Sequence, residues 1–180
     1  MSIALPPLTL IVGGAASGKS AYAERLMQAT GRPMTYVATA QAFDDEMRAK
    51  ISDHQARRGE GWTTVEAPLD IVPALKEARA ESVVLVDCMT LWLTNHLLGE
   101  TDLAHEEARA LDALSTSPAP VVVVSNEVGA GIVPENALAR RFRGAQGRLN
   151  QALATRADLV VTVIAGLPLA IKGDLPEGIA

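Results

Sequence analysis

The stretch GGAASGKS, residues 13–20, combines glycines, a lysine and serines at a spacing that suits the binding of phosphate groups. It matches the pattern G-x-x-x-x-G-K-[ST], the P-loop. Glycines let the backbone curl with its N–H groups facing phosphate oxygens, and a following helix adds its N-terminal amides. A chance glycine-rich turn is the alternative, but an apolar run precedes the motif and a helical pattern follows it. We therefore predict a nucleotide site that contains Gly13, Gly14, Ala15, Ala16, Ser17, Gly18, Lys19 and Ser20.

Three side chains in and beyond this motif would act on the bound phosphates. Lys19 is expected to reach the β- and γ-phosphates of a nucleotide, and the Ser20 hydroxyl to bind Mg²⁺. The apolar stretch VVLVD ends in Asp87, the type of residue that holds the same ion in a Walker B strand. An acidic helix cap is the alternative role for Asp87. The P-loop favours the metal role, so we predict that Ser20 and Asp87 bind Mg²⁺, partly through water.

A second kind of chemistry is suggested by the stretch DHQARRG, in which His54 stands close to Arg57 and Arg58. On a helix these three side chains share one face. A neutral imidazole can attack phosphorus and form a covalent intermediate, and arginines can neutralise the charge of a phosphate. An incidental histidine on a solvated helix is the alternative, and composition alone favours it.

The elements that would position these residues alternate between strands and helices. Continuous apolar runs rich in β-branched residues are typical of strands buried on both faces. They predict strands at 8–12, 82–87, 121–127 and 159–166, with two further strands at 34–40 and 62–68. Helical patterns occupy 19–30, 44–58, 70–80, 90–98, 102–114 and 137–155. The alternation predicts one α/β domain over residues 1–180, with a mostly parallel central sheet flanked by helices.

The loop SNEVGAG follows one of these buried strands. Ligands of α/β sheets bind at the carboxyl ends of the strands, so we expect Asn126 and Glu127 to face the site. Glu127 would serve as a base toward an acceptor hydroxyl or support Mg²⁺, and the pattern does not separate these roles.

The composition excludes several classes of function. The chain has 180 residues and a formal net charge of -5, which disfavours broad electrostatic binding to nucleic acid. Its single cysteine, Cys88, fits a reducing compartment. The N-terminal stretch lacks the charged region of a signal peptide, and no apolar run reaches the length of a membrane span. We therefore expect a cytoplasmic protein.

Several blocks of the sequence, taken in order, resemble one enzyme family. They include GGAASGKS, YVATAQAFDDEM, KISDHQARRGEGWTTVEAP, VDCMTLWLTNHL, SNEVGAGIVPEN and ARRFRGAQGRLNQALA. Over nearly its whole length the chain is similar to the bifunctional adenosylcobinamide kinase / adenosylcobinamide-phosphate guanylyltransferase of cobalamin biosynthesis. The resemblance implies a RecA-like P-loop fold and a homo-oligomer, with a trimer favoured.

The resemblance also implies two reactions. A nucleoside triphosphate, ATP or GTP, would phosphorylate the hydroxyl of adenosylcobinamide. GMP from GTP would then pass through a guanylylated histidine, here His54, to adenosylcobinamide phosphate, giving adenosylcobinamide-GDP and pyrophosphate. Beyond the P-loop, the nucleotide contacts implied by the resemblance fall on Ala38, Thr39, Ala40, Gln55, Ala56, Arg57, Arg58, Glu66 and Asp87.

Two other functions fit the P-loop by itself. The chain could be a simple kinase of a small alcohol or nucleotide, in which His54 is structural and no GMP is carried. It could also be a RecA-like regulatory module that binds a nucleotide without transferring any group.

Overall fold

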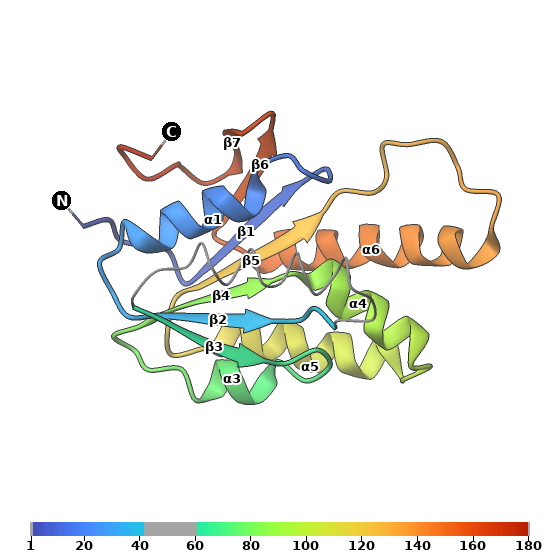
Figure 1. Cartoon of the computed structure of the whole chain (residues 1–180), viewed down its shortest axis with the longest axis horizontal. Helices are drawn as coiled ribbons and strands as arrows, with labels where there is room; N and C mark the ends of the chain where they lie inside the picture. Colours follow the sequence, from blue (N-terminus) through green and yellow to red (C-terminus); the bar gives the residue numbers. More distant parts are fainter. Residues whose placement is uncertain (1, 42–60, 180) are drawn as a thin grey trace.

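The computed structural model describes residues 2–41 and 61–179 and contains a seven-stranded sheet with the strand order β3-β2-β4-β5-β1-β6-β7 (Figure 1). The first six strands are parallel, and β7 is antiparallel to β6. The bounds of the strands are β1 Leu8–Gly13, β2 Met34–Ala38, β3 Trp62–Glu66, β4 Val83–Asp87, β5 Val121–Asn126, β6 Leu159–Ile164 and β7 Leu167–Lys172.

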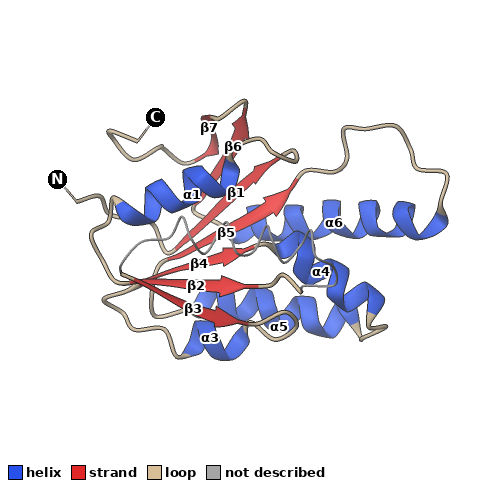
Figure 2. Cartoon of the chain, viewed as in Figure 1, coloured by secondary structure: helices blue, strands red, loops and turns tan. Residues whose placement is uncertain are grey.

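Helices cover both faces of this sheet (Figure 2). Helix α1 lies on one face, and the remaining described helices lie on the other. The bounds of the helices are α1 Lys19–Gln28, α3 Val72–Lys76, α4 Met89–Leu98, α5 Leu103–Thr116 and α6 Ala137–Arg156. The α/β class with a mostly parallel sheet is thereby confirmed. The helix predicted at 44–58 lies outside the described residues.

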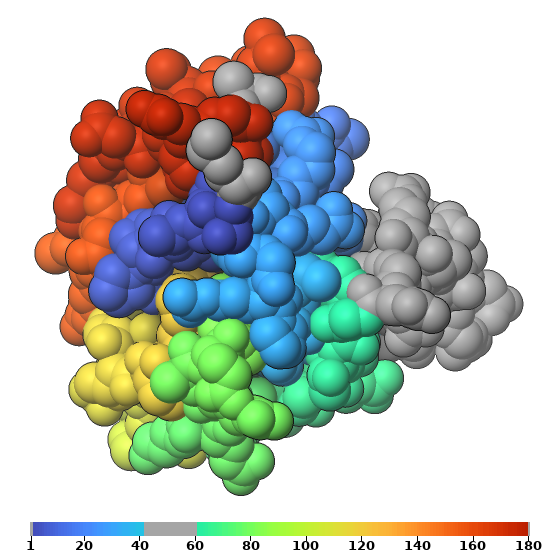
Figure 3. All heavy atoms as spheres, turned by 90° about the vertical axis from the view of Figure 1, so that its left-hand side faces the viewer, coloured from blue at the N-terminus to red at the C-terminus, as the bar shows by residue number. Residues whose placement is uncertain are grey.

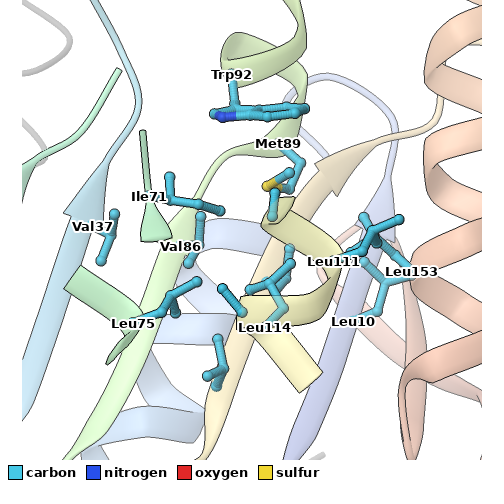
Figure 4. Packing of buried hydrophobic residues seen from close by; sticks show 14 of the residues in the cluster. Leu10, Val37, Ile71, Leu75, Val86, Met89, Trp92, Leu111, Leu114 and Leu153 are labelled. Carbon is cyan, nitrogen blue, oxygen red and sulfur yellow. The ribbon is translucent and has the colours of Figure 1, made fainter. Parts of the chain in front are cut away.

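The core consists of two apolar layers, one on each face of the sheet. Neighbouring residues of β4 point to opposite layers: Val84 and Val86 pack toward α3, α4 and α5, whereas Val83 and Leu85 pack toward α1. Figure 4 shows the larger layer, where Trp92 and other apolar side chains of the helices meet those of the strands. This double burial explains why the strands are continuous apolar runs instead of alternating patterns.

Helix α4 is more apolar than a surface helix requires, which at first suggests a subunit contact. In the structure most of the apolar side chains of α4 lie inside the protein, because Trp92 and Leu93 are buried. The indole nitrogen of Trp92 also donates a hydrogen bond to the carbonyl of Leu69 at 2.7 Å. Only the end of the helix presents a large apolar side chain to solvent, since Leu98 is 60% exposed.

Three elements differ most from the sequence prediction. The run at 159–166 ends earlier, because Ala165 and Gly166 both have positive φ angles, 52° and 81°, and form a two-residue hairpin turn into β7. Strand β7 was not predicted, since Pro168 argues against a strand and Ala-Gly is not a typical hairpin dipeptide. The helix predicted at 70–80 is only α3, in which Leu75 alone is fully buried, so little packing supports a further turn.

Both ends of the chain lie on the side of the molecule where the strands begin. Figure 3 shows the N-terminal segment beside the C-terminal segment on this side of the molecule. Ile3 and Leu5 pack against the same apolar layer as Leu175 and Ile179. The opposite edge, at the carboxyl ends of the strands, carries the loops of the candidate site. Within residues 2–41 and 61–179, none of the helices is both long and apolar enough to cross a bilayer.

Candidate active site

The predicted site residues that the structure describes lie at or just beyond the carboxyl ends of β1, β2, β3 and β4, an edge of the sheet that can be followed in Figure 1. Strand β5 lies between β1, which leads into the P-loop, and β4, which ends in Asp87. The register aligns Gly13 with Asn126 on one side of this group and Ala38 with Asp87 on the other. The phosphate-binding motif and the predicted metal ligand are therefore only one strand apart. This is the edge where parallel α/β sheets bind their ligands.

The P-loop connects β1 to α1 through a turn in which positions 13 and 18 favour glycine. Ala16 and Gly18 adopt positive φ angles of 55° and 95°. A Cβ atom added to Gly13 would lie 2.5 Å from Ser17 Oγ and 2.6 Å from the carbonyl oxygen of Val163. Helix α1 then begins at Lys19, so its free N-terminal amides lie at the end of the loop. The loop thus combines positive φ angles, close backbone contacts and a following helix N-terminus, which are features of the predicted phosphate site.

The β6–β7 hairpin supports the same loop from the other side. The backbone N–H of Gly166 donates a hydrogen bond to the carbonyl of Ser17 at 2.8 Å. A Cβ atom on Gly18 would lie 3.0 Å from the Cα of Gly166, so the two backbones are in close contact. Sequence reasoning missed this role of residues 163–166, because it took them as the end of a strand.

Lys19 is buried, with 9% of its surface exposed, and its Nζ donates to the carbonyl oxygen of Gly14 at 3.0 Å. Burial lowers the pKa of Lys19 below its usual value, and nearby Cys88 and Asp87 oppose this effect. The ammonium group is thus bonded to the P-loop backbone, and it lies close enough to Asp87 for the charge of that residue to affect its pKa. This arrangement suits a lysine that binds phosphate oxygens.

Ser20 and Asp87 are the oxygen donors predicted for Mg²⁺. Ser20 lies in the first turn of α1, which packs against β4, and Asp87 is the last residue of β4. Both side chains are partly buried. Mg²⁺ in nucleotide sites takes one or two protein oxygens together with phosphates and water, so this donor set fits the ion.

The loop after β2 lies next to Asp87, and the loop after β3 lies beside the loop after β2. The N–H of Ala67 donates to the carbonyl of Ala38 at 2.8 Å, which joins the two loops just beyond Glu66. Ala40 is partly buried and Glu66 is exposed, whereas Thr39 is completely buried. The Thr39 hydroxyl is bonded to the backbone of Cys88, so its side chain does not point toward solvent.

The remaining predicted site residues are those of the segment around the candidate nucleophile. They lie outside the described residues: His54, Gln55, Ala56, Arg57 and Arg58.

A polar cluster under the end of β5 was not predicted. The amide of Asn150 donates to the carbonyl of Asn126 at 3.0 Å, and Gln146 donates to the hydroxyl of Ser125 at 2.9 Å. Glu127, the next residue, donates its backbone N–H to the carbonyl of Gly13 at 2.9 Å. The end of β5 is therefore fixed against the P-loop. The only sequence signal was the pair of amides four residues apart on the otherwise apolar inner side of α6.

Comparison with solved structures shows the fold. The flagellar accessory protein FlaH from Methanocaldococcus jannaschii is 15% identical with a TM-score of 0.52, covering 96% of this chain and 80% of that one. The RadB recombinase is 20% identical with a TM-score of 0.53, covering 89% of this chain and 75% of that one. At such identities the likeness establishes the architecture alone, which is RecA-like as expected.

Comparison of sequences is more specific. The family model "Cobinamide kinase / cobinamide phosphate guanyltransferase" matches residues 9–171. The bifunctional adenosylcobalamin biosynthesis protein CobP of Pseudomonas aeruginosa is 46% identical, covering 92% of this chain and 97% of the relative. The protein CobU of Escherichia coli, which carries the same bifunctional description, is 39% identical over 92% of this chain and 99% of the relative. The chain therefore belongs to the cobinamide kinase / cobinamide phosphate guanyltransferase family.

Proposed function

We propose that this enzyme catalyses both reactions in the description of its family. It phosphorylates adenosylcobinamide with ATP or GTP, and it transfers GMP from GTP to adenosylcobinamide phosphate. The products of the second step are adenosylcobinamide-GDP and pyrophosphate. The observation that carries the proposal is the P-loop, with buried Lys19 beside Asp87, in a chain that the family model matches from residue 9 to residue 171.

In the kinase step the chain binds and orients the triphosphate. Backbone N–H groups of residues 13–20 bind phosphate oxygens, and Lys19 compensates the charge that develops between the β- and γ-phosphates. Mg²⁺ held by Ser20 and Asp87 supplies further charge compensation when it is bound. The acceptor hydroxyl forms a bond to the γ-phosphorus, the bond to the bridging oxygen breaks, and the nucleoside diphosphate leaves.

The proton of the acceptor hydroxyl needs an acceptor at the carboxyl edge of the sheet. Glu127 is an exposed carboxylate whose backbone is bonded directly to Gly13. Its Oε1 accepts a hydrogen bond from the N–H of Gly129, and we propose that the carboxylate takes this proton or supports Mg²⁺.

In the transferase step we assign the nucleophile to His54, on the strength of the sequence resemblance. Its imidazole would form a bond to the α-phosphorus of GTP as pyrophosphate leaves. A phosphate oxygen of the corrinoid would then attack the same phosphorus and release the histidine. Arg57 and Arg58 would neutralise the charge of the α-phosphate.

The other two histidines support this assignment. His96 is buried, and its ring nitrogens lie 2.7 Å from the hydroxyl of Thr101 and 3.0 Å from the carbonyl of Leu69. Its ring therefore has a structural role, because it binds the loop after β3. His105 lies in the exposed first turn of α5.

The test is covalent labelling with GTP labelled at the α-phosphate, in the presence of Mg²⁺ and with pyrophosphate removed. We expect acid-labile, base-stable label on the denatured wild-type protein. The label should be absent from His54→Ala and present on His105→Ala, which removes an exposed histidine outside the site. A folded wild-type protein that binds GTP and carries no label would instead support the simple kinase.

We also propose that the chain acts as a cytoplasmic homo-oligomer, with a trimer favoured by the resemblance. The edge strand β7 supports an assembly, because Leu167, Leu169 and Ile171 each expose more than 60% of their surface. Exposed apolar side chains on an edge strand are typical of contact surfaces. A monomeric mass in solution would contradict this part of the proposal.

A further inference from the structure

Two buried polar residues, Thr39 and Asn95, connect the loops that follow β2, β3 and β4. Thr39 directly follows the last residue of β2, and its exposed fraction is 0%. Asn95 lies in α4, and its exposed fraction is 6%. The hydrogen bonds of both side chains go to backbone groups just beyond the ends of these strands. The predicted metal ligand, Asp87, is the last residue of β4, and several of the predicted nucleotide contacts lie at the ends of β2 and β3 or directly after β2.

Every polar group of Thr39 is engaged. Its hydroxyl accepts a hydrogen bond from the N–H of Cys88 at 2.8 Å and donates one to the carbonyl of Cys88 at 2.7 Å. Its backbone N–H donates to the carbonyl of Asp87 at 3.3 Å. The residue therefore fixes the backbone of Asp87 and of the residue that follows it.

Asn95 completes this arrangement from the helix side. Its Nδ2 donates to the carbonyl of Thr39 at 2.9 Å and to the carbonyl of Pro68 at 2.9 Å. Because both partners are carbonyl oxygens, only the amide nitrogen can occupy this position. The loop after β3 is therefore held at a fixed distance from the loop after β2.

We propose that Thr39 and Asn95 are positioning residues, which hold the backbone at Asp87 where its carboxylate can share Mg²⁺ with the P-loop. Mg²⁺ requires short bonds in near-octahedral geometry. A small displacement of one of its ligands therefore weakens binding more than the same displacement of a hydrogen bond to phosphate does. Groups that orient a metal ligand commonly change metal affinity about 10- to 100-fold when they are removed. This inference rests on the proposed role of Asp87.

The experiment compares ATP affinity in EDTA with ATP affinity in Mg²⁺, in the full chain. Thr39→Val keeps the shape of the side chain and removes its hydroxyl. We expect ATP binding with Mg²⁺ to weaken about tenfold. ATP binding in EDTA should change by less than about twofold, because the hydroxyl is completely buried and bonded to Cys88, so that a nucleotide contact at residue 39 does not use it. Thr39→Ser restores the hydroxyl and should recover most of the loss. Thr116→Val removes an exposed hydroxyl at the end of α5 and serves as the matched control.

The outcomes separate a positioning role from a merely structural one. Equal weakening in EDTA and in Mg²⁺, or no weakening in Mg²⁺, would overturn the inference. Asp87→Asn is the reference variant. If Asp87→Asn weakens ATP binding only in the presence of Mg²⁺ and Thr39→Val does not, the inference fails while the role of Asp87 stands. If Asp87→Asn shows no such loss, the proposed metal role fails and the inference fails with it.

A second variant covers the case in which Thr39→Val does not fold. Asn95→Ala leaves room for water to satisfy the carbonyls of Thr39 and Pro68. The same loss confined to Mg²⁺ is expected for this variant, and its absence would overturn the inference.

Discussion

The two halves of the candidate active site are built by different means. The P-loop half takes most of its form from a short run of backbone, residues 13–20, in which glycine permits the turn and Lys19 bonds to Gly14 five residues away. The Asp87 half is held by side chains. There the bonds of Thr39 to Cys88 and of Asn95 to Thr39 span 49 and 56 residues of sequence.

The difference shows which parts of a site can tolerate change in the rest of the chain. A phosphate-binding loop formed by its own backbone depends mainly on its glycines and on its immediate contacts. A metal ligand held by distant side chains depends on the packing of an entire helix against several strands. Damage to the second half should therefore affect metal-dependent binding before it affects phosphate binding.

The largest effect is expected at Lys19, the side chain that belongs to both halves. Lys19→Met keeps the buried aliphatic chain and removes the charge, so phosphorylation of adenosylcobinamide at saturating ATP should slow about 10²- to 10³-fold. The initial rate of product formation measures the change. Lys76→Met, at an exposed position in α3, is the control and should act as the wild type does. A loss of less than tenfold would place the lysine outside the phosphate site.

An intermediate effect is expected where the P-loop contacts the hairpin. In Gly18→Ala the new residue must adopt a φ angle of 95°, and its Cβ would lie 3.0 Å from the Cα of Gly166. Because both effects strain the folded state, the unfolding free energy should fall by about 2 kcal/mol. ATP should bind about tenfold more weakly. Urea unfolding and ATP titration measure the two changes.

Gly31 provides the matched control for this change. It has a positive φ angle of 64°, and a Cβ at this position meets no atom within 4 Å. Gly31→Ala should lose about 1 kcal/mol of stability and no ATP affinity. If the two variants behave alike, backbone strain explains the result and the contact with the hairpin does not matter.

The smallest effect is a pH dependence in the Asp87 half. Burial, together with the charge of Asp87, raises the pKa of the Cys88 thiol from 9.0 to about 11. Between these values the unfolded chain loses its proton first, so the stability contributed by the neutral thiol falls as pH rises. We expect the unfolding free energy to fall by about 0.8 kcal/mol between pH 8 and pH 9.5.

Urea unfolding of wild type and Cys88→Ala at both pH values isolates this contribution. The shifted groups Lys19 and Tyr22 are present in both proteins, so the difference between the two proteins reports Cys88 together with its charge interaction with Lys19. If the unfolding free energy changes equally with pH in the two proteins, the thiol is accessible to water. The Asp87 half would then be less well packed than the structure indicates.

Sequence reasoning succeeded where structure is set locally. The strand expected at 8–12 is Leu8–Gly13, and the helix after the P-loop begins at Lys19 as expected. It failed where distant segments meet. Asn95 is one amide in an apolar helix, and only the complete fold brings the carbonyls of Thr39 and Pro68 to it. Strand β7 likewise forms because β6 offers it an edge, despite Pro168 in its sequence.

The hydrogen bond from Gly166 to Ser17 joins a residue made late in translation to one made early. At about 5–20 residues per second, roughly 7–30 s of synthesis separate the two. During this interval the chain on the ribosome already has its glycine motif, but it lacks the hairpin that contacts the motif and the strand β6 that pairs with β1. The P-loop therefore gains these supporting contacts only after residue 166 has been made, and any stability that a bound nucleotide adds by mass action comes after that point.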